Sequence, residues 1–182
     1  TLVEENRVGL ELPVCTVLPE FNGLRPIRPY EDPIKWGQQV QPPSSASALV
    51  DASEVTYRNL LVHNSGLPAW RPLKDQPDAD SARRMALSTD FFYPRGTRSV
   101  YSDIGLILLG MSIEKLTGLP LEGAVHQRVA QPLGLTQTRY LPLAGQPYDT
   151  SNISPTEVCA CRKRRVVGEV QDENAARLGG VA

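Results

Sequence analysis

Residues 55–68 read VTYRNLLVHNSGLP, a short helix signal that is bounded at both ends. Thr56 has the kind of hydroxyl that caps a helix N-terminus by accepting a hydrogen bond from a backbone N–H group further along. Leu60 and Leu61 are the apolar residues that we expect to face inward. Gly66, followed closely by a proline, is typical of the end of a helix. The stretch therefore predicts a helix that ends in a tight turn.

A second and more apolar helix is predicted further along the chain, with apolar positions from residue 104 to residue 116. Its isoleucines and leucines occupy most sides, which is typical of a helix that is buried on most sides, and a glycine follows as a natural stop. Tyr101, Ser102 and Asp103 stand at its start. A helix N-terminus offers free N–H groups and the positive end of a dipole, so a developing anion could be stabilised there. The alternative is that Ser102 or Asp103 only caps the helix.

The rest of the chain gives weaker signals. We expect residues 54–131 to be mostly helical, including a short helix at 78–88, and residues 1–9 to form the tail of an amphipathic helix. Residues 22–50 contain five prolines and a serine-rich run, which predicts a surface loop without strands. Beyond residue 133 the pattern becomes strand-like and turn-like, with a basic run at 162–165 that we interpret as a solvated loop or edge strand.

Composition excludes several classes of protein. The 182 residues are 41% apolar and 21% charged, which is enough for a hydrophobic core. A formal net charge of -1 argues against a nucleic-acid-binding protein, which needs a basic excess. No apolar run approaches the ~18 residues that span a bilayer, and no signal peptide is visible. Cys15, Cys159 and Cys161 are too few for a disulfide scaffold and wrongly spaced for the usual zinc site, so we predict inert thiols and no metal ion.

Several segments, taken in order, resemble motifs of the β-lactamase-related serine hydrolases. This family includes class C β-lactamases, D-Ala-D-Ala carboxypeptidases and penicillin-binding-protein-like esterases. The likeness spans nearly the whole chain apart from the proline-rich loop. The segments that carry it are 2–21 (LVEENRVGLELPVCTVLPEF), 55–68, 94–96 (PRG), 101–103 (YSD), 108–110 (LLG), 117–118 (TG), 131–138 (QPLGLTQT) and 168–182 (GEVQDENAARLGGVA).

The resemblance implies an α+β fold of the β-lactamase/transpeptidase type. Residues 1–182 would be one partial domain that supplies mainly the helical portion with an incomplete sheet, and 22–50 would be a surface loop within it. In this family a serine of an S-x-x-K motif forms an acyl-enzyme, and its lysine and the tyrosine of a Y-x-N motif share the proton transfers. By resemblance Tyr101 is the general base, while Ser102 and Asp103 contact substrate. Asp103 stands where Asn is commoner, and no cofactor is implied.

The resemblance also assigns a role to His63, which matches the histidine of an "HxSG" motif. A catalytic base is one possibility, but we favour a structural ring that ties the end of its helix to a neighbouring loop. Ser65 and Gly66 are interpreted as a turn rather than a nucleophile, because no G-x-S-x-G sequence surrounds them. Gln171 replaces a histidine of the family pattern, which weakens any assignment of a site there.

The family's nucleophilic serine and its K-T-G or H-x-G strand are expected outside the matching segments. The chain has one S-x-x-K match, Ser112 to Lys115, which follows Tyr101 and is interpreted as chance. We therefore interpret both ends as cut from a longer polypeptide. The leading hypothesis is a fragment of a serine hydrolase that acts on an ester, amide or β-lactam in a small molecule or peptide, and that is inactive alone, with exposed apolar surface and a tendency to aggregate.

Two alternatives remain open from the sequence. The first is a non-catalytic binding or interaction module derived from the family. The second is a complete small enzyme that uses Ser112 and Lys115.

Overall fold

The computed structural model describes residues 1–35, 37–43, 49–140, 149–160 and 162–180. The chain divides into two compact units. The first comprises Thr1–Arg71 and Arg84–Leu121, and the second comprises Pro72–Arg83 and Glu122–Ala182. Helices are combined with three small antiparallel sheets of two strands each among the described residues, so the fold is α+β with a limited sheet content.

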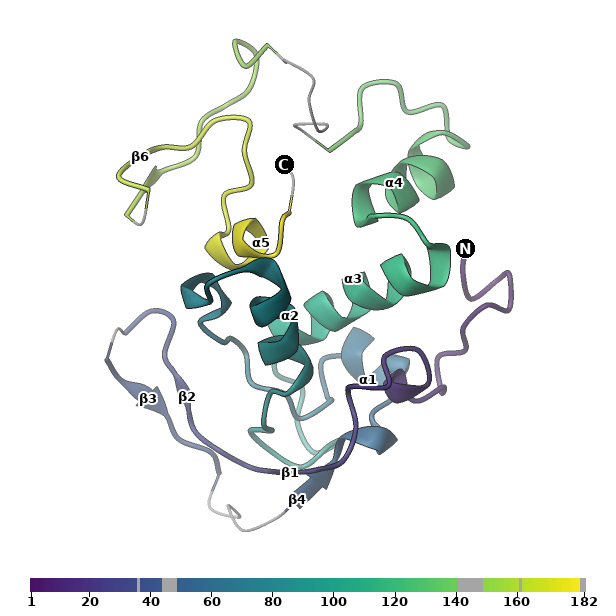
Figure 1. Cartoon of the computed structure of the whole chain (residues 1–182), viewed down its shortest axis with the longest axis vertical. Helices are drawn as coiled ribbons and strands as arrows, with labels where there is room; N and C mark the ends of the chain where they lie inside the picture. The colour runs from purple at the N-terminus through teal and green to yellow at the C-terminus, as the bar shows by residue number, and fades with distance from the viewer. Residues whose placement is uncertain (36, 44–48, 141–148, 161, 181–182) are drawn as a thin grey trace. The chain divides into compact units, whose positions relative to one another are not determined.

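The first unit is built around α1 (Tyr57–Leu61) and α3 (Asp103–Thr117), which pack against each other (Figure 1). Apolar side chains from both helices and from the segments around them are removed from water, and this burial is the main favourable contribution to folding. The fully buried side chains of this unit include Val14, Phe21, Val55, Leu60, Leu67, Phe91, Ile104 and Leu108.

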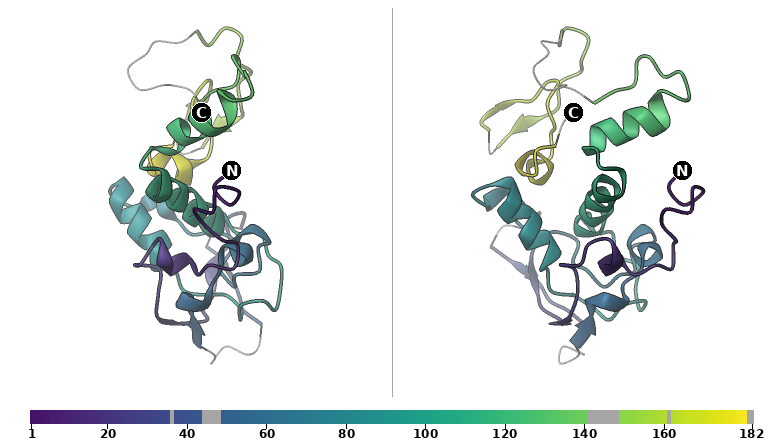
Figure 2. Two further views of the ribbon diagram at one scale, coloured as in Figure 1. Left: turned by 90° about the vertical axis from the view of Figure 1, so that its right-hand side faces the viewer. Right: turned by 45° about the vertical axis from the view of Figure 1, so that its right-hand side comes forward.

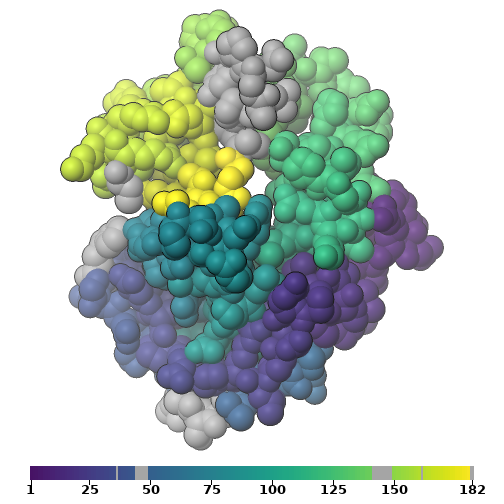
Figure 3. Space-filling model, in the orientation of Figure 1, coloured from purple at the N-terminus to yellow at the C-terminus, as the bar shows by residue number. Residues whose placement is uncertain are grey.

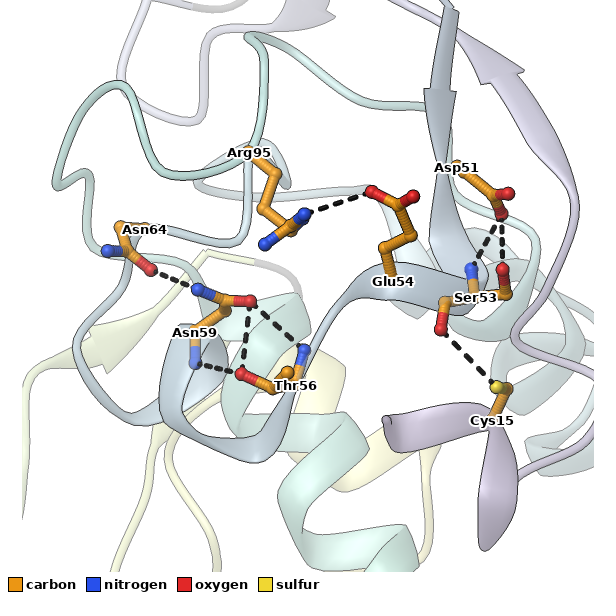
Figure 4. Close-up of polar contacts among 8 residues, drawn as sticks. All are labelled: Cys15, Asp51, Ser53, Glu54, Thr56, Asn59, Asn64 and Arg95. Carbon is orange, nitrogen blue, oxygen red and sulfur yellow. Dashed lines mark hydrogen bonds and ion pairs between the residues drawn. The ribbon is translucent and has the colours of Figure 1, made fainter. Parts of the chain in front are cut away.

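The start of α1 is as predicted. Thr56 Oγ1 accepts from the N–H of Asn59 at 3.3 Å, and Asn59 Oδ1 accepts from the N–H of Thr56 at 3.0 Å, which is a reciprocal capping box. Asn59 also donates to Asn64 Oδ1 at 2.9 Å, so the capping residues are joined to the turn after the helix (Figure 4). The same view shows Arg95 paired with Glu54 at 2.9 Å.

The end of α1 is earlier than predicted. The helix ends at Leu61, five residues before Gly66, because His63 adopts a left-handed backbone with φ of 56°. Leu60 is fully buried as expected, whereas Leu61 is 52% exposed. Adjacent residues of a helix point in different directions, and a helix of five residues buries only one narrow face. Only one of the two leucines can therefore face the core.

The prediction that 22–50 contains no strands is wrong. β1 (Leu24–Pro26) pairs antiparallel with β4 (Leu49–Asp51), and β2 (Tyr30–Glu31) pairs with β3 (Gln39–Val40). These strands are too short to show a clear alternation in the sequence. Proline is tolerated because Pro26 is the last residue of an edge strand. The serine-rich run 44–47 lies outside the described residues.

Residues 1–9 form turns rather than the tail of a helix. One hydrogen bond of helical spacing is present, from Glu5 N to Thr1 O at 2.9 Å, and the chain then turns at Asn6, which has a positive φ of 55°. The apolar side chains still face inward in part, since Leu2, Val3 and Val8 line a groove together with residues of α3. These N-terminal residues, in purple, lie beside α3 in the space-filling view (Figure 3).

The other predicted helices are found with small changes. α2 spans Ala79–Leu87, and Asp78 caps it by accepting from Ser81 N at 2.7 Å. α3 ends at Thr117 and is followed by Gly118, whose φ of 72° is left-handed as expected. α4 (Leu121–Val125) continues into a π-helical turn at His126–Ala130. The long irregular segment between α2 and α3 makes 54–131 less helical than predicted.

The second unit contains β5 (Val158–Cys159), β6 (Arg164–Arg165) and α5 (Glu173–Arg177) (Figure 2). The basic run therefore contributes an exposed strand, as predicted. Residues 136–140 form no strand, and Leu141 and Cys161 lie outside the described residues. No single helix in the described ranges is long and apolar enough to cross a membrane.

Candidate functional site

The start of α3 is fixed by Ser102. Its hydroxyl accepts from the N–H of Gly105 at 3.2 Å and donates to the carbonyl oxygen of Pro68 at 2.6 Å. Only 1% of Ser102 is exposed, so both hydrogen bonds are buried. The next residue, Asp103, donates its backbone N–H to Ala69 O at 2.9 Å. Ser102 is thus the N-cap, and α3 begins directly against the segment that follows the turn after α1.

That turn is docked onto residues 91–100 by backbone hydrogen bonds. Gly66 O accepts from Phe92 N at 2.7 Å, and Asn64 O accepts from Gly96 N at 2.8 Å. Gly66 has a φ of 91°, and a Cβ atom at this position would collide with the carbonyl oxygen of Tyr93. Glycine is therefore required both by conformation and by space. Ser65 and Gly66 form a turn, as predicted.

His63 links this turn to the start of α3. Its carbonyl oxygen accepts from Val100 N at 2.8 Å and from the hydroxyl of Tyr93 at 3.3 Å. Its Nδ1 accepts from the backbone N–H of Ser102 at 3.2 Å. Since Nδ1 accepts, the neutral ring carries its hydrogen on Nε2. The structural role that we favoured for His63 is the one that these contacts show.

Tyr101 packs on the same imidazole. The two ring centroids are 4.8 Å apart and the planes are inclined by 40°. The residue is nevertheless 61% exposed, so the phenol is accessible from solvent while one face of its ring rests on His63. A hydroxyl that is to exchange a proton with an incoming group needs this accessibility.

The three predicted site residues differ in what their side chains can reach. Tyr101 is exposed, and Asp103 is partly buried at the first residue of α3. The hydroxyl of Ser102 is buried and is already engaged by Pro68 and Gly105. The sequence suggested the capping role of Ser102, but it gave no signal for Pro68 as the acceptor, because that contact joins segments 34 residues apart.

The pair Ser112 and Lys115 is not arranged as a nucleophile and its base. Ser112 is 2% exposed and donates to Leu108 O at 2.8 Å, which is the usual bond of a serine back to its own helix. Lys115 is exposed on the helix surface. Burial raises the pKa of the neighbouring Tyr57, and the Ser112 hydroxyl opposes this shift more weakly. The structure therefore gives no support to a complete small enzyme that uses Ser112.

The thiols lie in two different environments. Cys15 contacts the carbonyl oxygen of Ser53 at 3.6 Å (Figure 4), and the buried Cys159 contacts Glu173 Oε1 at 3.4 Å. Among the described residues, no group of three histidine, cysteine or acidic side chains is placed to hold a metal ion. Cys161, which was considered with them in the sequence, is outside that range.

Comparison with known proteins identifies the relatives of this chain. A protein of Escherichia coli K12 named "Putative D-alanyl-D-alanine carboxypeptidase" is 30% identical over 144 residues, which cover 68% of this chain and 33% of that protein. An N-acetylmuramyl-L-alanine amidase of Bacillus subtilis is 33% identical over 136 residues, covering 64% of this chain and 31% of the amidase. The chain therefore spans about a third of the length of the curated relatives that it matches.

The fold is shared with solved structures. EstCE1, described as a hydrolase with promiscuous acyltransferase activity, superposes with a TM-score of 0.54 over 94% of this chain and 41% of its own, at 23% identity. The predicted α+β fold of the β-lactamase/penicillin-binding-protein type is confirmed, and this chain carries part of it. The family model named Beta-lactamase matches residues 1–170. The chain belongs to the beta-lactamase family.

Proposed function

We propose that this chain carries one side of an acyl-transfer site of a serine hydrolase, with Tyr101 as the group that accepts and returns the proton. The observation that supports this role is the exposed phenol at the start of α3, held against the ring of His63 at 4.8 Å. An exposed tyrosine whose ring is fixed on one face can meet a substrate without first being ordered.

The chemistry explains why a phenol is useful there. A serine hydroxyl attacks a carbonyl efficiently only when a nearby base removes its proton. The phenolate of Tyr101 would take that proton as the acyl bond forms, and the phenol would return it to the leaving amine or alcohol. A cation must lie beside the phenolate, since the ordinary pKa of tyrosine is ~10. In the family this cation is the lysine of the S-x-x-K motif.

The nucleophile of this proposal is not among the 182 residues. The chain's single S-x-x-K sequence begins at Ser112, which is buried and donates to Leu108 O. We therefore propose that the serine and lysine belong to another part of a longer protein, that residues 1–182 are one partial domain of it, and that the chain alone is inactive. Ester, amide and β-lactam carbonyls, in a small molecule or a peptide, remain the proposed substrates, and the chemistry requires no cofactor.

Asp103 and Ser102 would contact a substrate in different ways. Asp103 is the better of the two predicted contacts, because its carboxyl group lies on the first turn of α3 and is only partly buried. Ser102 is proposed to act through its position in the backbone rather than its hydroxyl, which is occupied. The names of the relatives, a carboxypeptidase and an amidase, favour an amide substrate.

Covalent labelling tests the proposal. Purified residues 1–182 are incubated with a fluorescent fluorophosphonate and with fluorescent penicillin, beside an active serine hydrolase as a positive control, after circular dichroism has shown that the chain is folded. We expect no stoichiometric label. Labelling that disappears in Ser112→Ala would instead support the small-enzyme alternative.

A binding assay distinguishes the proposed acyl-transfer site from the remaining alternative, a non-catalytic binding module. Tight binding of a peptide or glycan by residues 1–182, with the same affinity in Tyr101→Phe, would favour a non-catalytic module over half of a catalytic site. Under our proposal Tyr101→Phe changes the surface that substrate meets, so any peptide that binds there should bind the two proteins differently.

A further inference from the structure

The second unit contains a cavity of about 300 Å³ with a charged lining. It lies between α5 and the 3₁₀ turn Leu73–Asp75, and its volume is at the lower end of the range for small-molecule sites. The residues that line it are Lys74, Asp75, Arg162, Glu173, Ala176 and Arg177.

One wall of the cavity is held rigidly. Asn174, which is 3% exposed, accepts the backbone N–H of Lys74 at 2.8 Å and so attaches α5 to the 3₁₀ turn. Arg177 strengthens the same junction, because its Nε donates to Lys74 O at 3.1 Å and its Nη1 donates to Pro77 O at 3.3 Å. These bonds use part of the five N–H donors of a guanidinium and fix its plane. Its other N–H groups have no partner among the residues that the structure describes, so they can donate to a ligand.

Arg162 supplies a second guanidinium from the segment between β5 and β6. Its Nη1 donates to Gln171 O at 3.4 Å, and its backbone N–H points at the sulfur of Cys159 at 3.5 Å. Within the part of the chain that the structure describes, neither Arg162 nor Arg177 forms an ion pair with a carboxylate. Both guanidinium groups line the cavity. Arg162 also lies close enough to Glu169 to help lower the pKa of that carboxyl group, although the two form no ion pair among the described residues.

The two acids of the lining are engaged differently. Asp75 accepts from Lys74 Nζ at 2.8 Å, and these two charges offset each other. Glu173 contacts the thiol of Cys159 at 3.4 Å. With three cations and two carboxylates, the lining retains one positive charge. That balance suits a single negative charge, whereas a dianion would leave the site negative and would face Glu173.

We propose that this cavity binds a small molecule through a carboxylate group, held by Arg162 and Arg177. A guanidinium presents two parallel N–H donors that match the two oxygens of a carboxylate, and such charge-assisted pairs are about twice as strong as neutral hydrogen bonds. The proposal goes beyond the acyl-transfer function and does not depend on Tyr101, so either can fail without the other.

NMR titration with sodium acetate tests the proposal on the whole chain. The side-chain Nε–H signals of arginine are followed at constant ionic strength, with sodium chloride replacing acetate in the reference series. We expect saturable shifts of the Arg162 and Arg177 signals. In Arg162→Gln the dissociation constant should rise about tenfold, the loss expected for one hydrogen-bonded charge partner. Shifts that grow linearly with concentration, or no shifts, would overturn the proposal.

Two further variants test whether the effect of Arg162 is specific to its place in the cavity and to the geometry of its guanidinium group. Arg165→Gln removes the same charge from the neighbouring exposed strand but not from the cavity lining, and it should change the dissociation constant by less than about twofold. Arg162→Lys keeps the charge but loses the two parallel N–H donors of the guanidinium. Its affinity for acetate should therefore lie between those of the wild type and Arg162→Gln. Equal losses in Arg162→Gln and Arg165→Gln would show a general charge effect, and phosphate binding tenfold tighter than acetate would contradict the carboxylate assignment.

Discussion

Nδ1 of His63 accepts the backbone N–H of Ser102 at 3.2 Å, a bond between residues 39 positions apart in the sequence. It ties the turn after α1 to the N-cap of α3, and the same imidazole supports the ring of Tyr101. One side chain therefore sets the position of both the helix start and the phenol. This arrangement makes His63 a positioning residue for Tyr101, although it is not expected to exchange protons with a substrate itself.

Replacement of His63 should destabilise the first unit. His63→Ala leaves the buried N–H of Ser102 without its acceptor, which costs about 1–3 kcal/mol in the free energy of unfolding. The backbone φ of 56° adds no penalty specific to alanine, because histidine holds the same left-handed conformation in the wild type. His63→Gly also loses the ring but accepts this φ freely, so it should be about 1 kcal/mol more stable than His63→Ala and still less stable than the wild type. Urea denaturation measures both, and a His63→Ala protein as stable as the wild type would show that the ring contributes nothing.

Gly66 should tolerate no side chain. Gly66→Ala must accommodate a Cβ atom against the carbonyl oxygen of Tyr93 and hold a φ of 91°, so we expect a loss of about 3 kcal/mol in the free energy of unfolding. Gly96→Ala is the matched control, because its φ is 77° but no atom lies within 4 Å of the added Cβ. It should cost about 1 kcal/mol. Equal losses in the two variants would mean that backbone conformation alone, and not the close approach to Tyr93, explains the glycine.

The two buried serines of the α3 region should contribute very differently to the free energy of unfolding. Ser102→Ala removes the N-cap and leaves Pro68 O without its donor, so a loss of about 2 kcal/mol is expected. Ser112→Ala removes a bond to its own helix and introduces the best helix former, so the free energy of unfolding should change by less than about 0.5 kcal/mol. Thermal or urea unfolding of the two variants makes the comparison, and a large loss in Ser112→Ala would show that its hydroxyl also supports the buried hydroxyl group of Tyr57.

The sequence predicted the helix starts better than the loops, for a physical reason. Thr56 and Ser102 act on N–H groups three residues ahead, so their capping is encoded locally. The same holds for the stop at Gly118. The pairing of β1 with β4 joins segments about 25 residues apart through strands of three residues each, and no local pattern specifies such a partner.

The candidate site shows the same division between local and distant information. Tyr101 and His63 could each be named from motifs that resemble a known family, and their ring contact was not visible in either motif. The charged cavity could not be predicted at all, because its residues come from three separated segments around 74, 162 and 177. Long-range contacts of this kind appear only when the fold is known.

The ion pair between Glu169 and Arg164 gives a prediction about pH. The two guanidinium nitrogens contact the two carboxylate oxygens at 2.8 and 2.7 Å, and this hydrogen bonding lowers the pKa of Glu169 below its ordinary value. A carboxylate with a lowered pKa contributes stability above its unfolded pKa, and the contribution is lost as the pH falls through the folded pKa. The carboxyl ¹³C signal of Glu169 should therefore titrate at lower pH in the wild type than in Arg164→Gln, whereas Arg165→Gln should have little effect.

Because the pair is exposed, added salt should raise the titration midpoint of Glu169 in the wild type toward that in Arg164→Gln. Identical midpoints in the wild type and Arg164→Gln at low salt would show that the pair does not form in solution.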